Sequence, residues 1–292
     1  MEKKERHTLS IADLTIQLNT DQRLAEEKAF LPFFTQTEFP DFVAEFCRVD
    51  KLPPVQGKLM VREKSYQVYQ DEDRNYYRTF CDIPTDMKTY AVARYDYRNG
   101  TIHVDYLESG VECVAEFQNS FFHLAFEELL IYRNRMIFHA SCVKTSFGGL
   151  LFSGPSGIGK STQADLWCKH RRGKLINGDR PVLSKAGDSW LSWGSPYAGS
   201  SRCYVNESSP ITAVVMLRQA SECSLRRLST GEAFRAVWSG LTVHTWDPEF
   251  VRRASDLALD LISSVPIFEF SCTPDERAVE YLEKSLRKEN LI

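Results

Sequence analysis

An eight-residue stretch near the middle of the chain, 154–161, has the spacing Gly-x-x-x-x-Gly-Lys-Ser. Glycines lack a Cβ, so such a backbone can curl with its N–H groups pointing inward as a nest for an anion. The positive end of a following helix strengthens that nest. In this pattern Lys160 reaches the β- and γ-phosphates of a nucleotide, and the hydroxyl of Ser161 ligates Mg²⁺. The spacing therefore predicts a P-loop that binds ATP and Mg²⁺.

The residues on either side of the stretch supply the context that the pattern needs. An apolar strand is expected over 150–152, directly before the loop, and a helix over 161–169, directly after it. The alternative is a glycine-rich turn with a solvated lysine. The residues expected to contact the phosphates are Gly154, Ser156, Gly157, Ile158, Gly159, Lys160, Ser161 and Thr162.

A phosphotransferase also needs a carboxylate near the metal, and Asp179 is the candidate. It stands at the end of 174–179, where we expect a strand that carries the acid toward the phosphates. Asp179 follows the loop closely in sequence, which favours a small phosphotransferase over transport and motor ATPases. We expect it to act as the general base or, with Ser161, as a metal ligand. The alternative is that Asp179 caps a turn before Pro181.

His139 is a third candidate catalytic residue, at the start of the segment that leads toward the loop. A histidine there can polarise a phosphate or orient Asp179; the alternative is a histidine satisfied within the core. A further positive group for the phosphates could come from Arg180, Arg202 or Arg218, which the sequence does not rank.

Periodicity predicts a β-rich first part. Residues 90–97 and 101–106 alternate around Asn99-Gly100, a pair that favours a tight hairpin turn, and 58–70 is expected to be a strand pair or one long strand. An amphipathic helix is expected over 117–135, from apolar residues spaced by three and four.

The second part reads as alternating strands and helices. A hairpin is expected over 136–152, leading into the loop, and a buried strand over 211–217. Helices are expected over 230–238, 247–263 and 274–286, and a short strand over 267–270. We place the domain boundary before the amphipathic helix, which gives a β-rich domain over 1–115, with substrate recognition through a sheet edge as one role for it, and a catalytic domain over 116–292.

Composition excludes several function classes. The net charge of the 292-residue chain is −3, so no global positive field draws it to nucleic acid or to anionic lipid. No apolar stretch has the length of a membrane span, and no leader-like segment follows Met1. The eight cysteines include no CxxC pair, which argues against a zinc site and a disulfide framework and favours reduced thiols. We therefore expect a cytoplasmic protein.

Together these features resemble the C-terminal catalytic domain of HPr kinase/phosphorylase and its relative, ATP-dependent phosphoenolpyruvate carboxykinase. In that family a hairpin that begins with a histidine precedes a GxSGxGKS loop, and a strand ending in an acidic pair follows. Residues 139–143, 154–161 and 175–180 look like these three parts, and the resemblance continues through 194–199 and 214–219. It covers about the last 160 residues.

The resemblance implies an α/β fold with a P-loop kinase core, preceded by a smaller β-rich α+β domain. It gives Lys160 and Ser161 phosphate and metal roles, and Asp179 matches one acid of the family's pair. Arg180 stands where the family has the second acid, so phosphorolysis is not carried over. The second glycine-flanked signature of the bifunctional HPr enzymes is absent from the sequence, so HPr is not carried over as the substrate. HPr kinases assemble into oligomers, which leaves a homo-oligomer open for this chain.

The expected activity is transfer of the γ-phosphoryl group of MgATP to a serine or threonine hydroxyl of a peptide or protein. Two alternatives stay open. One is a kinase for a free amino acid or another metabolite, and the other is a nucleotide-gated binding module with no transfer chemistry.

Overall fold

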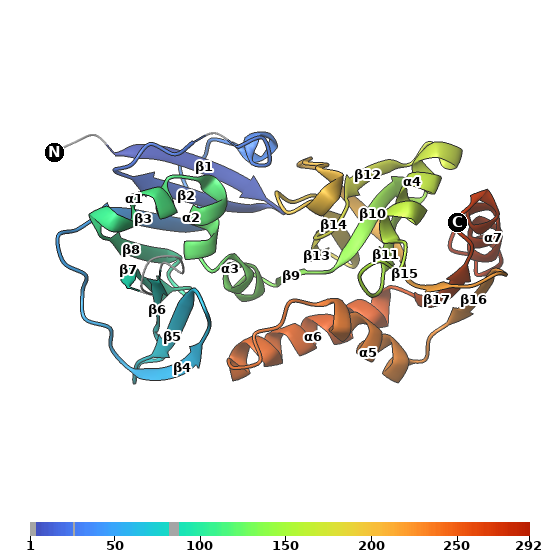
Figure 1. Ribbon diagram of the computed structural model, residues 1–292. Coiled ribbons are helices and arrows are strands. Elements are labelled where there is room, and N and C mark those ends of the chain that lie inside the picture. The colour runs from blue at the N-terminus through green and yellow to red at the C-terminus, as the bar shows by residue number, and fades with distance from the viewer. Residues whose placement is uncertain (1–3, 26, 82–87) are drawn as a thin grey trace. The chain divides into compact units, whose positions relative to one another are not determined.

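The computed structural model describes residues 4–25, 27–81 and 88–292, and it divides into two compact units of mixed α/β structure (Figure 1). Unit 1 comprises Met1–Arg133 and His244–Phe250, and unit 2 comprises Asn134–Val243 and Val251–Ile292. The expected boundary between residues 115 and 116 lies before a helical stretch, whereas the contacts divide the chain after that stretch. His244–Phe250, which connects two helices of the second half and includes the first residues of the second helix, also belongs to unit 1.

Unit 1 is built on a sheet that has eight strands within the described residues, in the order β1-β2-β3-β8-β7-β6-β5-β4. Strand β3 runs parallel to both β2 and β8, and the other neighbours are antiparallel. The strands are β1 (Glu5–Ile11), β2 (Leu14–Thr20), β3 (Phe42–Arg48), β4 (Lys58–Arg62), β5 (Tyr66–Gln70), β6 (Tyr76–Cys81), β7 (Thr89–Asp96) and β8 (Thr101–Tyr106).

The hairpin predicted around Asn99-Gly100 is confirmed as β7 and β8, and the strand pair predicted within 58–70 is confirmed as β4 and β5. Gly100 has a φ of 72°, and a Cβ at this position would lie 2.3 Å from the backbone oxygen of Asp41. Both the turn and this close approach therefore require glycine.

The prediction of one helix over 117–135 is wrong. The chain forms α2 (Phe117–His123) and α3 (Phe126–Tyr132), separated by Ala125 in a left-handed conformation with φ 53°. The break lets the rings of Phe121 and Phe126 meet edge to face at 5.2 Å, so packing prevails over the helical period. The remaining short helices of unit 1 are η1 (Leu31–Phe33), η2 (Glu108–Gly110) and α1 (Val111–Val114).

A buried ionic cluster ties the returning segment into unit 1. Arg78 is 4% exposed and forms an ion pair with Glu128, which is 2% exposed. Nδ1 of His244 lies 2.7 Å from Oε1 of the same carboxylate. The Arg78 guanidinium also lies over the ring of Tyr66, 5.0 Å from its centroid.

Unit 2 is built on a second sheet, which has nine strands within the described residues. The main order is β12-β10-β11-β15-β14-β13-β9, and β17 pairs with β15 and β16. Strands β11, β15 and β17 are parallel neighbours. The strands are β9 (Arg135–Ile137), β10 (Ala140–Thr145), β11 (Gly148–Ser153), β12 (Lys174–Asn177), β13 (Val182–Ala186), β14 (Ser189–Trp193), β15 (Ser208–Gln219), β16 (Ser224–Arg227) and β17 (Ile267–Cys272).

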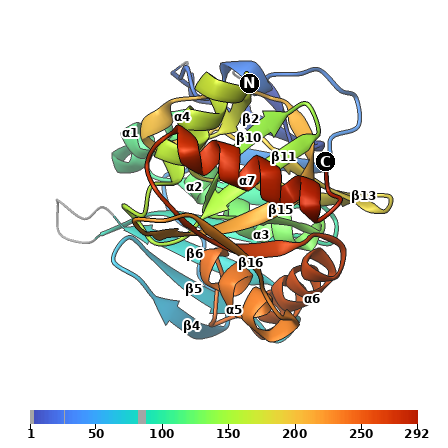
Figure 2. The same cartoon turned by 90° about the vertical axis from the view of Figure 1, so that its right-hand side faces the viewer.

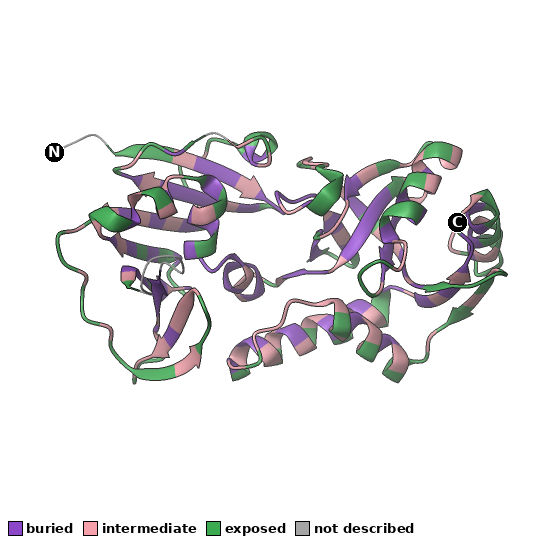
Figure 3. Cartoon of the chain, viewed as in Figure 1, coloured by how far each residue is buried: buried purple, intermediate pink, exposed green. Residues whose placement is uncertain are grey.

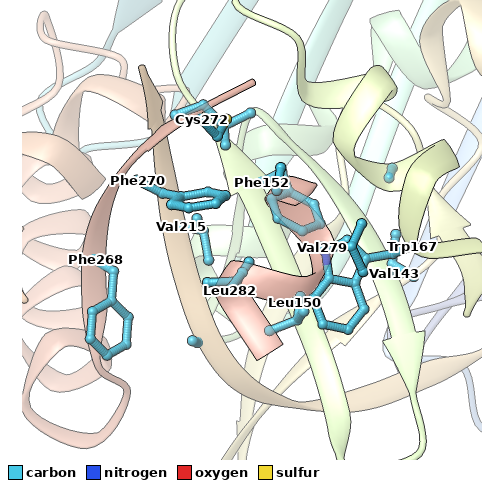
Figure 4. Close-up of a cluster of buried hydrophobic side chains, with 14 of the residues drawn as sticks. Val143, Leu150, Phe152, Trp167, Val215, Phe268, Phe270, Cys272, Val279 and Leu282 are labelled. Carbon is cyan, nitrogen blue, oxygen red and sulfur yellow. The ribbon is translucent and has the colours of Figure 1, made fainter. Parts of the chain in front are cut away.

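Helices lie on both faces of the parallel part of this sheet (Figures 1 and 2). On one face, Trp167 of a helix that follows β11 and Leu282 of the last helix pack with Phe152, Val215 and Phe270 of the strands (Figure 4). Most residues of β10 and β11 are buried; Lys144, near the end of β10, is exposed (Figure 3). The helices of unit 2 are α4 (Lys160–Arg171), η3 (Gly199–Ser201), α5 (Thr230–Gly240), most of α6 (Pro248–Ser264) and α7 (Glu276–Lys288).

Most elements predicted for the second half are confirmed, with shifts of a few residues at their ends. Two differ: the strand expected over 174–179 ends at Asn177, so Asp179 lies in the turn that follows, and the first run of the hairpin expected over 136–152 divides into β9, which pairs with β13, and β10. The hairpin before the loop is β10 and β11, and the helix after it is α4. The buried strand predicted over 211–217 lies within β15, and the later helices and strand are α5, α6, β17 and α7. The eight cysteines form no disulfide. Among the described helices, none is both long and apolar enough to cross a lipid bilayer.

Candidate active site

The glycine-rich loop connects the end of β11 to the start of α4. Gly154, Gly157 and Gly159 have φ values of 141°, 78° and 111°, a region that L side chains rarely adopt. A Cβ at Gly157 or Gly159 would meet nothing within 4 Å, so the backbone angle rather than crowding requires glycine there. Gly154 is also confined, because its Cβ would lie 3.3 Å from the side chain of Ile158.

The loop delivers the chain directly into the N-terminus of α4. Gly159 is the N-cap, and the first backbone bond into the helix runs from the N–H of Gln163 to the oxygen of Gly159 at 3.0 Å. The first N–H groups of a helix have no partner within it, and they carry the positive end of the helix dipole. Ser161 and Thr162 are exposed on this first turn, as Ser156 is on the loop. The arrangement offers donors to an anion.

Lys160 folds back over the loop that precedes it. It is 8% exposed, and its Nζ donates hydrogen bonds to the backbone oxygens of Gly154 at 3.0 Å and Pro155 at 3.3 Å. An ammonium group has three N–H donors, so one is left for a ligand. Burial lowers the pKa of Lys160, and the carboxylate of Asp179 acts in the opposite direction.

Asp179 and His139 meet at the same edge of the sheet because β10 and β12 are antiparallel neighbours. The backbone N–H of Ala140 donates to the oxygen of Asp179 at 3.0 Å, which aligns the start of β10 with the residues after β12. Nε2 of His139 lies 3.2 Å from Oδ1 of Asp179. Nε of Arg180 lies 3.5 Å from Oδ2 of the same carboxylate.

The pKa of His139 depends on charged groups from both this sheet edge and the loop. Burial lowers the pKa of His139, the positive charge of Lys160 lowers it further, and the carboxylate of Asp179 raises it. Lys160 and Asp179 are thus both close enough to act on the imidazole. Of the three residues predicted to be catalytic, His139 and Asp179 are in contact, and Lys160 acts on His139 through its charge.

Sequence reasoning missed Asn177, the residue that holds the Asp179 turn. Asn177 is 0% exposed, and its Oδ1 accepts hydrogen bonds from the backbone N–H groups of Asp179 at 2.9 Å and Arg180 at 2.7 Å. Its Nδ2 donates to Oγ of the buried Ser195 at 3.1 Å. An asparagine that ends an apolar strand just before Gly-Asp is the signal that could have found it, because asparagine side chains favour such turns.

The turn η3 covers Asp179 from the other side. A Cβ at Gly199 would lie 2.8 Å from Cβ of Asp179 and 3.0 Å from its Cγ. A Cβ at Gly178 would lie 2.2 Å from Oγ of Ser201. Two glycines therefore allow the turn and the carboxylate to pack closely, and the backbone around Asp179 is fixed by contacts on both sides.

The arginines proposed for a further positive role lie at different places. Arg180 pairs with Asp179, and Arg202 follows η3 on the surface with a left-handed φ of 49°. Nε of Arg218 lies 2.6 Å from Oε2 of Glu269, beside a cavity that also adjoins the start of the loop. Of the three, Arg180 alone contacts a predicted catalytic residue within the part of the chain that the structure describes.

No family of known sequences and no curated protein matches this chain. A solved structure, the HPr(Ser) kinase/phosphatase from Coxiella burnetii, is similar to 52% of this chain and to 97% of its own, with 14% sequence identity and a TM-score of 0.34. This is a weak likeness at the level of the fold.

Proposed function

We propose that unit 2 is an ATP-dependent phosphotransferase with a P-loop kinase core, which moves the γ-phosphoryl group of MgATP to a serine- or threonine-type hydroxyl of a peptide or protein. One observation carries the proposal: the lysine of the glycine loop folds back onto Gly154 at 3.0 Å, beside a sheet edge where His139 meets Asp179 at 3.2 Å, and the charges of Lys160 and Asp179 both act on the pKa of His139. A turn with a solvated lysine would not bury Lys160 to 8% exposure.

The loop residues are assigned to the phosphates. The positive-φ glycines let the backbone curl, and the first turn of α4 supplies free N–H donors next to them. The remaining N–H of Lys160 adds a charge-assisted hydrogen bond to the transferring group. The proposed phosphate contacts come from the loop between Gly154 and Thr162.

Ser161 and Asp179 are assigned to Mg²⁺. Magnesium keeps several waters and takes one or two carboxylates plus phosphate oxygens, so one carboxylate and one hydroxyl suit it. The ion, when bound, neutralises charge on the phosphates. Among the described residues no three His, Cys, Asp or Glu side chains form a metal cluster, and the proposed ligand set does not require one.

Asp179 is assigned the proton of the acceptor. In the transfer, the acceptor oxygen forms a bond to the γ-phosphorus, the bond from that phosphorus to the ADP oxygen breaks, and the hydroxyl proton passes to the carboxylate. His139 orients Asp179 through its Nε2, and Asn177 fixes the backbone that carries it. The acceptor-recognition role of unit 1 remains a proposal that rests on its strand content.

A second candidate, a nucleotide-binding module without transfer, is favoured by one contact. Arg180 lies 3.5 Å from Oδ2 of Asp179, and an arginine on the carboxylate competes with metal binding and proton uptake. Both candidates share the loop and differ only at this carboxylate.

Incubation with γ-labelled ATP and Mg²⁺ separates the candidates, with the peptides and metabolites of the source cell as acceptors. Label in a peptide or protein supports the proposal, and label in a small molecule supports a metabolite kinase instead. Tight ATP binding with no label transferred supports the second candidate. Arg180→Ala is the informative companion variant, because a non-transferring module gains no activity from it.

A further inference from the structure

A cavity of about 310 Å³ opens beside the start of the glycine loop. Gly154 and Pro155 line it on the loop side, residues 216–218 line it from β15, and Arg235 and Ala236 line it from α5. Small-molecule sites usually measure about 300–1,000 Å³, so the cavity is of the size that takes a compact ligand. Its lining belongs entirely to unit 2.

The charged groups of the cavity largely neutralise one another. Arg218 and Arg226 both pair with Glu269, at 2.6 and 3.4 Å, and Arg226 also pairs with Glu232 at 3.0 Å. Arg235 is the exception, because it has no hydrogen-bond or ion-pair partner among the described residues.

The rest of the lining is largely apolar, with Met216, Leu228 and Ala236. Paired charges beside apolar atoms suit an uncharged ring with polar edges better than a phosphate or a carboxylate. The unpaired guanidinium of Arg235 adds a group that stacks well on an aromatic face.

The strand order places this cavity on the far side of the loop from the carboxylate. In the sequence β12-β10-β11-β15-β17, Asp179 follows β12, the loop follows β11, and the cavity lies over β15 and β17. Ligands of α/β sheets bind outside the carboxyl ends of parallel strands, where this loop lies. A triphosphate on the loop whose terminal phosphate faces Asp179 therefore has its other end directed toward β15.

We propose that this cavity binds the nucleoside half of the nucleotide, its base and ribose. The inference rests on the proposed function, and it leaves the Asp179 side of the loop for the acceptor. The base lies on the apolar lining, and Arg235 covers one of its faces.

Isothermal titration with two probes tests the assignment: MgATP, which has a nucleoside, and inorganic tripolyphosphate with Mg²⁺, which has none. Ala236→Trp fills the cavity from α5, and Ser239→Trp, an exposed position on the same helix outside the lining, is the matched control. Ala236→Trp is expected to weaken MgATP at least about tenfold and to change tripolyphosphate binding less than about twofold. Arg235→Ala is expected to weaken MgATP alone, by a smaller factor.

Three results overturn the assignment. If Ala236→Trp binds MgATP as tightly as the wild type, the nucleoside does not bind in the cavity. If the same variant has an increased KM for the acceptor, the cavity binds the acceptor instead. Equal weakening of both probes means that the substitution acts through the loop. If the wild-type protein binds neither probe, the proposed function itself fails, and that outcome is distinct because it does not depend on any variant.

Discussion

Nε2 of His139 lies 3.2 Å from Oδ1 of Asp179, at the edge of the sheet where β10 begins and β12 has just ended. Burial and the charge of Lys160 hold the pKa of His139 below its usual range, which favours a neutral ring at pH 7. A neutral imidazole can donate its Nε2 proton to the carboxylate without competing for the acceptor's proton. The contact between His139 and Asp179 is therefore consistent with a histidine that orients Asp179 as the base.

Asp179→Asn should abolish most of the transfer activity while the fold persists. The amide keeps the shape of the side chain but cannot accept the acceptor's proton, and loss of a general base costs about 10²–10⁴-fold in kcat. Initial rates with γ-labelled ATP measure kcat, and calorimetry without Mg²⁺ measures the affinity for ATP itself, which should change less than about threefold. Full turnover in this variant contradicts the base assignment.

His139→Gln should lower kcat by roughly 10- to 100-fold with little change in the KM for ATP. Without the imidazole, the carboxylate of Asp179 is held less well in the position where it accepts the proton, and a misplaced base reacts slowly. The glutamine amide can still donate to the carboxylate, so His139→Ala should be the more damaged of the two variants. Equal kcat values for Gln and Ala would argue that His139 does not act through this hydrogen bond. An increase in the KM for ATP with an unchanged kcat would indicate that His139 contacts the nucleotide instead.

Asn177→Ala should separate the positioning of Asp179 from its chemistry. The substitution leaves two backbone N–H groups without their acceptor, which costs about 1–3 kcal/mol of stability for each buried group left unsatisfied. We expect a lower kcat, an unchanged ATP affinity and faster hydrogen exchange at the amides of Asp179 and Arg180. Ser141→Ala, which removes a hydrogen bond to the oxygen of Gly178 at 2.8 Å, is the control for general loosening of this strand end. Wild-type exchange rates at both amides in Asn177→Ala would show that the side chain does not hold the turn.

Local patterns in the sequence predicted the loop and the elements around it. The spacing of Gly154 to Ser161, the apolar strand before it and the Asn99-Gly100 hairpin all depend on residues close together in the chain, and those elements formed as expected. Burial lowers the pKa of Lys160, and Asp179 lies near enough to act on it in the opposite direction, as expected for a carboxylate carried toward the loop, although the strand before it ends at Asn177.

Long-range packing produced the features that the sequence did not predict. Ala125, in a left-handed conformation, breaks a helix whose periodicity continues across it, and the rings of Phe121 and Phe126 meet edge to face across the break. His244 contacts Glu128, which lies 116 positions earlier in the chain, and a pattern of neighbouring residues cannot predict a pair so far apart in sequence. Asn177 has a recognisable turn signal, but its partner Ser195 is set by the fold.

Removing Arg78 should strongly destabilise unit 1. Arg78→Met leaves the buried Glu128 with His244 as its remaining ion-pair partner, and breaking a buried pair costs about 3–5 kcal/mol. The double variant Arg78→Met/Glu128→Leu removes both charges and should recover a large part of that loss. Urea unfolding measures the free energy of unfolding of the wild type, the single variant and the double variant. A single variant as stable as the wild type, or a double variant no better than the single, contradicts the pairing.

His123 should make the protein less stable as the pH falls. Burial lowers its pKa to about 4, and its Nδ1 contacts the backbone oxygen of Asn119 at 2.6 Å, while its Nε2 lies 3.0 Å from the hydroxyl of Tyr90. The folded pKa lies below the unfolded value of 6.5, so the unfolded state binds the extra proton between pH 6.5 and 4. Stability from this group is complete above pH 6.5 and is lost progressively down to pH 4, by about 3 kcal/mol in all.

Comparison of the wild type with His123→Phe isolates that effect from other titrations. The variant cannot titrate at this position, so its melting temperature should fall less than that of the wild type between pH 7 and pH 4.5. Parallel curves over this range would show that His123 does not stay neutral in the folded protein.

The most direct test of the account is calorimetry of MgATP binding to the wild type, Lys160→Met and Lys169→Met. Lys169 is exposed farther along the same helix, so its variant controls for loss of one positive charge. We predict saturable binding to the wild type and to Lys169→Met, and a loss of at least about tenfold in affinity for Lys160→Met. No heat of binding to folded wild-type protein, or equal affinities for all three, would contradict the claim that this loop holds a nucleotide.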